Sequence, residues 1–201
     1  MKLIVVDYGL GNLASVGNAL KRLCIPFAVS SRSEDLAKAT AIILPGVGAA
    51  EAGMQGLIEH GLDIALKQAA QKGTPILGIC LGMQLLMGSS QEGDVQCLGL
   101  VPGTVKKFQT DLKVPQMGWN QVTAAGDSSL LRNITANSYF YFVHSYYCAP
   151  TNSEIVTGET DYDGQFCSIY EQDGIAGVQF HPEKSGEAGL TLLSNFWEAA
   201  C

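Results

Sequence analysis

Residues 78–82, Gly-Ile-Cys-Leu-Gly, constrain the fold of this chain more than any other segment. They follow an apolar run at residues 74–77 and precede a helix-compatible run at residues 83–87. A reactive residue flanked by two glycines, between a strand and a helix, is the pattern of a nucleophile elbow. Such a turn exposes the sulfur at a helix N-terminus, where N–H groups and the helix dipole favour a thiolate. The pattern predicts that Cys80 is a nucleophile, the alternative being a core cysteine.

The order of apolar and helical patterns predicts one α/β domain over residues 1–201. The first half alternates strand and helix, with strands at residues 2–7, 26–30, 41–44 and 75–79, a helix capped by Asn12, and a helix over residues 51–71. This order implies a parallel sheet with helices on both faces. Short strand patterns then follow at residues 105–108, 120–123, 139–143, 154–158, 166–170 and 175–180, before a last helix at 186–200. We therefore expect an open, mixed, mostly parallel sheet flanked by helices, flavodoxin-like, with antiparallel additions in its second half.

Composition excludes several classes of function. A net charge of −7 and the lack of a basic run argue against nucleic-acid binding. The sequence has no apolar stretch of membrane-spanning length, and its first residues, interrupted by Asp7, are typical of a strand rather than a signal peptide. Six scattered cysteines without a C-x-x-C pair predict free thiols in a reducing cytoplasm, and neither a zinc site nor a redox motif. We expect no metal and no cofactor.

A cysteine nucleophile needs a base, and the chain has three histidines. His60 lies near the end of a polar-faced helix, and we expect it at the surface. His144 ends an aromatic strand, whereas His181 ends an apolar strand and is followed by Pro182 and Glu183. Reactive groups gather at the carboxyl ends of strands in open α/β sheets, so Cys80 and His181 can meet there. Glu183 can then orient the ring, although His181 could instead be a structural histidine and Glu183 a solvated turn acid.

Acyl transfer also needs donors to an oxyanion. The N–H of Leu81, directly after the nucleophile, is the geometric choice. A second donor could come from the Pro-Gly-Val-Gly segment at residues 45–48, where glycines let the backbone approach a ligand, unless this is a plain turn. A further glycine motif, G-x-G-x-x-A at residues 9–14, makes dinucleotide binding conceivable. That match is weak among 23 glycines, and Glu34 follows a serine-rich turn rather than a strand end.

Two segments together resemble the class I glutamine amidotransferases. They are Gly-Ile-Cys-Leu-Gly-Met-Gln at residues 78–84 and Gly-Val-Gln-Phe-His-Pro-Glu at residues 177–183. Further segments, at residues 7–12, 45–48, 117–120, 141–146 and 184–186, are similar to the branch formed by the glutaminase subunits of imidazole glycerol phosphate synthases, from histidine biosynthesis. The resemblance extends from Asp7 to Phe196.

The resemblance implies a mechanism that agrees with the one read from the residues. Cys80 attacks the side-chain amide of glutamine, His181 moves the protons and Glu183 orients His181. The family's glutamine pocket maps onto Gly48, Gln84, His144, Ser145 and Tyr146. This makes His144 a pocket-wall residue rather than the base. In the family, Val47 supplies an oxyanion N–H only after a local backbone rearrangement.

The resemblance also implies a partner. It is a (β/α)8-barrel cyclase that forms a heterodimer with the glutaminase, receives its ammonia, and makes imidazole glycerol phosphate and AICAR from a phosphoribulosyl substrate. Asn12 and Trp119 are the candidate interface residues, the alternative for Trp119 being core packing. Gln116, where relatives often have histidine, and Ala50, where an aromatic is common, depart from the family. Other readings are a glutaminase for another synthase, a partner-independent thiol hydrolase and a catalytically silent binding subunit.

Overall fold

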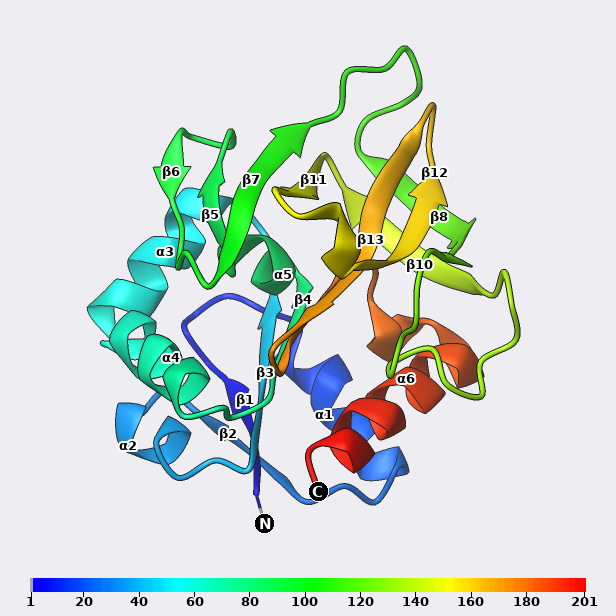
Figure 1. Cartoon of the computed structure of the whole chain (residues 1–201). Helices are drawn as coiled ribbons and strands as arrows, with labels where there is room; N and C mark the ends of the chain where they lie inside the picture. The colour runs from blue at the N-terminus through cyan, green and yellow to red at the C-terminus, as the bar shows by residue number, and fades with distance from the viewer. Residues whose placement is uncertain (1) are drawn as a thin grey trace.

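A mixed sheet runs through the molecule, with helices on both of its faces (Figure 1). The computed structural model describes residues 2–201. The strand order is β2-β1-β3-β4-β14-β13-β11-β7-β5-β6, with β9 and β12 attached beside β13. Strands β2, β1, β3, β4 and β14 are mutually parallel, and the pairs that involve β13 and β11 are antiparallel. The expected α/β class, with antiparallel additions in the second half of the chain, is confirmed.

The strands and helices have the following bounds. The strands are β1 Leu3–Val6, β2 Phe27–Ser30, β3 Ala41–Gly46, β4 Ile76–Cys80, β5 Met87–Ser90, β6 Val95–Gln96, β7 Val101–Lys107, β8 Gln116–Gln121, β9 Thr123–Ala124, β10 Tyr139–His144, β11 Tyr146–Pro150, β12 Val156–Asp161, β13 Gln165–Gln172 and β14 Ile175–Val178. The helices are α1 Leu13–Arg22, α2 Ser33–Leu36, α3 Ala50–Glu59, α4 Leu62–Gln71, α5 Leu81–Leu85 and α6 Gly186–Ala199, with short 3-10 turns η1 Ser153–Ile155 and η2 Pro182–Lys184.

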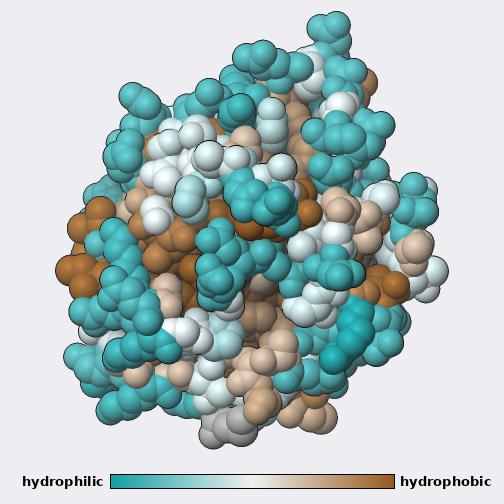
Figure 2. Space-filling model, viewed as in Figure 1, coloured by the Kyte–Doolittle hydropathy of each residue, from teal (hydrophilic) through white to brown (hydrophobic). Residues whose placement is uncertain are grey.

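Alternation along the central strands builds two hydrophobic cores. In β1, Ile4 and Val6 face the core beneath α2, α3 and α4, whereas Leu3 and Val5 face the core beneath α1 and α6. This period of two follows from the pleat of a strand, and because helices cover both faces, every residue of β1 is buried. Some apolar surface stays outside. Figure 2 shows hydrophobic residues over α3 and α4, which carry the exposed side chains of Ile58 and Ile64.

The structure corrects three local expectations. The helix expected over residues 51–71 is two helices, because Gly61 adopts a left-handed φ of 63° and ends the first of them. The helix after the elbow ends at Leu85, and the chain enters β5 at Met87. Asn12 precedes α1, but within residues 2–201 its side chain accepts no bond from the helix N–H groups. It donates to Glu183 instead.

The sheet register places the reactive segments side by side. Gly46 of β3 pairs with Cys80 of β4, and Ile79 pairs with Val178 of β14. The carboxyl ends of these three parallel strands therefore meet at one edge of the sheet. The segment of Val47 and Gly48, the elbow and the segment of His181 all leave the sheet at this edge, as a ligand site in an open α/β sheet requires.

Candidate active site

Cys80 sits in a strained turn at the end of β4. Its φ of 54° and ψ of −110° are values that residues with a side chain rarely adopt. The two flanking glycines make the turn possible. A Cβ at Gly82 would lie 1.8 Å from the carbonyl oxygen of Leu44, and one at Gly78 would lie 2.7 Å from the backbone of Met83. The sequence pattern thus corresponds to a real elbow, which holds the Cys80 side chain at the rim of a cavity.

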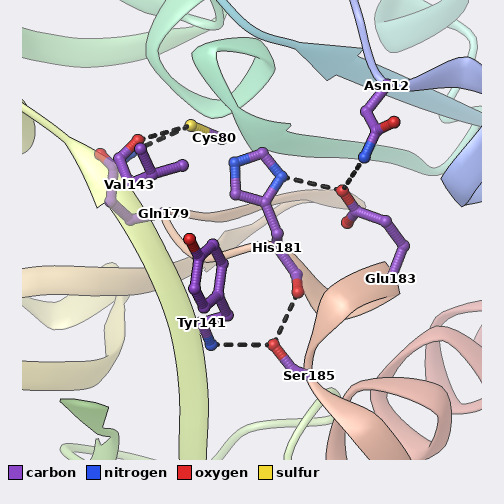
Figure 3. A network of polar contacts seen from close by, with 8 residues as sticks. All are labelled: Asn12, Cys80, Tyr141, Val143, Gln179, His181, Glu183 and Ser185. Carbon is purple, nitrogen blue, oxygen red and sulfur yellow. Dashed lines mark hydrogen bonds and ion pairs between the residues drawn. The ribbon is translucent and has the colours of Figure 1, made fainter. Parts of the chain in front are cut away.

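His181 and Glu183 are joined by a buried hydrogen bond close to Cys80 (Figure 3). Nδ1 of His181 lies 2.8 Å from Oε1 of Glu183, and the side chains are 1% and 0% exposed. Asn12 donates from Nδ2 to the same carboxylate oxygen, at 3.3 Å. Among the described residues, Nε2 of His181 has no hydrogen-bond partner. The ring therefore keeps one nitrogen on the acid and leaves the other for proton transfer.

The environment of His181 favours its protonated form. Burial alone lowers its pKa, but the neighbouring Cys80 sulfur and the Glu183 carboxylate outweigh burial and raise the pKa to about 10. A histidine that gains a proton when a neighbouring thiol loses one is suited to act as its base.

The backbone around His181 is fixed by Ser185. Its Oγ donates to the carbonyl of His181 at 2.6 Å and accepts from the N–H of Tyr141 at 3.0 Å. The N–H of His181 in turn donates to the carbonyl of Tyr141 at 2.9 Å. Ser185 is 3% exposed, so these bonds form away from solvent. They tie η2 to strand β10 and hold the imidazole toward the elbow, as Figure 3 shows.

A cavity of about 230 Å3 opens beside Cys80 and His181. The sequence-predicted pocket residues Gly48, Gln84, His144, Ser145 and Tyr146 all line it, as do the predicted oxyanion residues Val47 and Leu81. Leu81 is the first residue of α5, so its N–H has no acceptor within the helix. Gly48 has a φ of +102°, which a side chain would oppose. The structure therefore brings together every pocket residue that the resemblance implied.

Glu92 and Pro115 also line the cavity, and the sequence pointed to neither. Glu92 is the only acidic residue among the lining residues within the described chain. Its Oε2 accepts the N–H of Ala50 at 2.8 Å, which ties the loop after β5 to the start of α3. The signal that could have revealed Glu92 is weak: it is one acid in a polar turn, and it reaches the cavity only through tertiary folding.

His144 is a neutral pocket-wall residue. Burial lowers its pKa to about 4, helped by the nearby His181. Its Nδ1 lies 2.8 Å from the carbonyl of Tyr146, which can only accept, so Nδ1 carries the proton. Nε2 lies 2.8 Å from Oε1 of the Gln116 carboxamide, on the other side of the ring. Gln116, one of the two residues noted above as departures from the family pattern, thus contacts the pocket wall through His144.

The two candidate interface residues lie outside the cavity. Trp119 is 56% exposed on β8, so core packing, the alternative interpretation for this residue, is wrong. Asn12 contacts the triad acid, as described above. His60, at the end of α3, is exposed as expected, with Nδ1 2.8 Å from the carbonyl of Gly56.

Neither a metal site nor a spanning segment is evident in the part of the chain that the structure describes. Residues 2–201 contain no cluster of three or more histidine, cysteine or acidic side chains placed to hold a metal ion. No helix among them is long and apolar enough to cross a membrane.

The fold and the site define a class of enzyme. Residues 4–199 match the family Glutamine amidotransferase class-I, and the chain belongs to that family. Within it, the chain belongs with the proteins described as imidazole glycerol phosphate synthase subunit HisH. It is 47% identical to the one from Moorella thermoacetica, over 96% of this chain and 93% of that protein. It is 48% identical to the one from Chlorobaculum tepidum, over 96% and 98% of the two chains.

Solved structures show the same fold at lower identity. A crystal structure described as glutamine amidotransferase superposes with a TM-score of 0.78 at 20% identity, covering 98% of each chain. The structure of PurLQS from Thermotoga maritima gives a TM-score of 0.77 at 18% identity, covering 100% of this chain and 99% of that one. These structures confirm the fold, whereas the family expected from the motifs is confirmed by the family match and by the identity to HisH subunits.

Proposed function

We propose that this chain is the glutaminase subunit of an imidazole glycerol phosphate synthase. It hydrolyses L-glutamine to glutamate and ammonia with Cys80, His181 and Glu183, and passes the ammonia to a (β/α)8-barrel cyclase. The observation that carries the proposal is the position of Cys80 on a strained elbow, next to a buried His181–Glu183 pair, at the rim of a small cavity. The identity of the chain to HisH subunits supports the same activity.

The reaction follows from the positions of these groups. The Cys80 thiol transfers its proton to Nε2 of His181 while Sγ attacks the amide carbon of glutamine. The N–H of Leu81, and that of Val47 after a backbone rotation, stabilise the oxyanion that forms. The imidazolium, held by Glu183, protonates the leaving nitrogen, and ammonia departs from a glutamyl thioester. Water then attacks this thioester, with His181 as base, and glutamate and the free thiol are restored.

The cavity suits glutamine in size and charge. Its volume of about 230 Å3 is smaller than the roughly 300–1,000 Å3 of sites that bind drug-sized ligands. A cavity of this size fits a small substrate such as an amino acid. Glu92 offers a carboxylate to the α-ammonium group of an amino acid. The backbone of Gly48, Ser145 and Tyr146 lines the remaining wall and can bind the α-carboxylate. No cofactor takes part in this mechanism, because the thiol and imidazole supply all of its chemistry.

An exposed apolar face next to the triad supports the proposal that the chain binds a partner subunit. On the ribbon of β8 and β10, Trp119 pairs with Tyr141 and Met117 pairs with Val143. Trp119, Met117 and Tyr139 are 56%, 64% and 55% exposed. Aromatic residues and methionine are enriched at protein interfaces. The Tyr141 carbonyl of the same ribbon accepts the backbone N–H of His181. We propose that the cyclase docks on this face, reaching Trp119 and, at its edge, Asn12.

The free cysteines bear on the cellular compartment, and the exposed aromatic face bears on the choice between this activity and its alternatives. All six cysteines are free in the structure of residues 2–201, which fits a reducing cytoplasm. A thiol hydrolase that works without a partner would have the same triad. The exposed aromatic face, which such an enzyme does not need, favours the partner-dependent activity.

The test is glutamate release from glutamine, measured with and without the cyclase and its phosphoribulosyl ligand. We expect strong stimulation by the liganded cyclase, and no release from Cys80→Ala under any condition. A chain that cleaves glutamine equally fast without the cyclase, or that cleaves esters and peptides instead, would contradict the proposal.

A further inference from the structure

Two buried carboxamides connect the wall of the glutamine pocket to the nucleophile. Gln84 is 5% exposed and Gln179 is fully buried. Nε2 of Gln84 donates to the carbonyl of Tyr146 at 2.9 Å and to Oε1 of Gln179 at 3.0 Å. Nε2 of Gln179 lies 3.8 Å from Sγ of Cys80 (Figure 3). A continuous polar path therefore runs from a backbone carbonyl to the sulfur.

The backbone carbonyl determines the orientation of both amides. The Tyr146 oxygen can only accept, so Gln84 must present its NH2 group there. The same NH2 group faces Gln179, which must therefore turn its oxygen toward Gln84. The NH2 group of Gln179 is left facing Cys80. The opposite orientation of Gln179 would place two donors against each other in a region closed to water, at a cost in free energy.

We propose that Gln179 is a catalytic residue, whose side-chain N–H donates to Sγ of Cys80 and stabilises the thiolate. This inference rests on the proposed role of Cys80 as the nucleophile. In the resting thiol, S–H donates to the carbonyl of Val143 at 3.8 Å. When the proton moves to Nε2 of His181, that bond is lost. The donor from Gln179 remains and strengthens, because hydrogen bonds to an ionised acceptor are the stronger ones.

Among the groups around Cys80, Gln179 is the neutral side chain that can donate a hydrogen bond to the sulfur. Tyr8, Cys148 and His181 are titratable side chains whose pKa values the nearby Cys80 sulfur affects. Burial raises the pKa of both Tyr8 and Cys148, so both stay protonated and uncharged. His181 supplies the charge partner, and Gln179 supplies a neutral donor on the sulfur. A hydrogen bond to the charged form of a group favours that form, so the Gln179 donor stabilises the Cys80 thiolate relative to the thiol.

The test measures thiolate reactivity directly and does not depend on glutamine turnover. Cys80 alkylation by iodoacetamide is followed against pH by mass spectrometry of the peptide that contains Cys80, with the exposed Cys24 as an internal reference. Gln179→Leu removes the donor, and Gln179→Glu keeps an acceptor for Gln84 while facing the sulfur with a carboxylate oxygen. Asn195→Leu is the matched control. It removes another buried amide, which donates to the carbonyls of Leu130 and Arg132 in a different part of the protein.

We expect Cys80 in Gln179→Leu to react about 3- to 10-fold more slowly at neutral pH, with its profile moved up by roughly half to one pH unit. Gln179→Glu should slow alkylation further, and Asn195→Leu should leave it unchanged. A Gln179→Leu profile that matches the wild type would overturn the proposal. So would equal slowing in Asn195→Leu, since the effect would then be general loosening.

A second measurement needs no Gln179 variant, in case neither folds. In the ¹⁵N-labelled wild-type protein, alkylation of Cys80 should shift the side-chain NH2 resonances of Gln179 and leave those of Asn195 in place. Unmoved Gln179 resonances would refute the contact. Glutamate release by the complex is measured in parallel. If release is absent while Gln179 controls alkylation, the proposed function fails and the donor role stands.

Discussion

Replacing Cys80 with glycine should give a more stable protein than replacing it with alanine, which reverses the usual order of these residues. Cys80 has φ 54° and ψ −110°, a conformation that costs a residue with a Cβ about 1–3 kcal/mol. Glycine avoids that cost but loses about 0.5–1 kcal/mol more than alanine through the entropy of the unfolded chain. The difference leaves Cys80→Gly more stable than Cys80→Ala by about 1 kcal/mol, or roughly 2–4 °C in Tm for a chain of this size.

The assay is urea and thermal unfolding of the two variants under identical conditions. The matched control is Ala52→Gly at an exposed position in helix α3, where glycine should destabilise the protein by about 0.5–1 kcal/mol. Because both Cys80 variants lack the sulfur, the difference between their unfolding free energies reports the backbone strain at position 80. Equal stability at position 80, or greater stability of the alanine variant, would refute the strained elbow. Both variants should lack glutaminase activity, because both remove the thiol. The more stable glycine variant would then show that the proposed nucleophile is kept at the expense of stability.

Three further predictions follow from the site. The pKa of His144, lowered to about 4, means that the folded protein resists protonation there, so stability is full above about pH 6.5 and falls as the pH drops toward 4. His144→Asn should remove roughly 1.5 kcal/mol of the wild-type loss in unfolding free energy between pH 6.5 and pH 5, and an unchanged slope would contradict this. In Cys80→Ala, the pKa of His181 should fall below its wild-type value of about 10 in an NMR titration, because the sulfur that favours the imidazolium is gone; a constant value would assign the whole effect to Glu183. Trp119→Ala should change stability by less than about 0.5 kcal/mol, as expected for a surface residue, while weakening cyclase binding in calorimetry; a large loss of Tm with binding intact would place Trp119 in the fold instead.

The elbow and the parallel half of the sheet could be predicted from sequence because local pattern decides them. Gly78 and Gly82 are required by contacts with adjacent backbone, and the alternation in β1 matches two covered faces. The pairing of Cys80 with His181 followed from a general rule about strand ends, with no need for detailed contacts. The resemblance to a family supplied the pocket residues, which the structure brings together around one cavity.

What sequence could not show depends on contacts between distant segments. Asn12 has the position and residue type of a helix cap, yet its amide donates to a carboxylate 171 residues away. The path from Tyr146 through Gln84 to Gln179 exists only because strand β11, helix α5 and the segment after strand β14 meet. Strand β11 was missed because its residues alternate poorly between the two faces. The break at Gly61 is different, since a glycine after a polar helix end was a readable stop signal.

The central claim is that Cys80 generates ammonia for a partner, and one measurement tests it most directly. The complex of this chain with its cyclase is assayed for imidazole glycerol phosphate formation with glutamine and, separately, with ammonium salt as nitrogen source. We predict that the wild-type complex uses both sources and that the Cys80→Ser complex uses ammonium alone, at the wild-type rate. A Cys80→Ser complex that still makes product from glutamine would contradict the account.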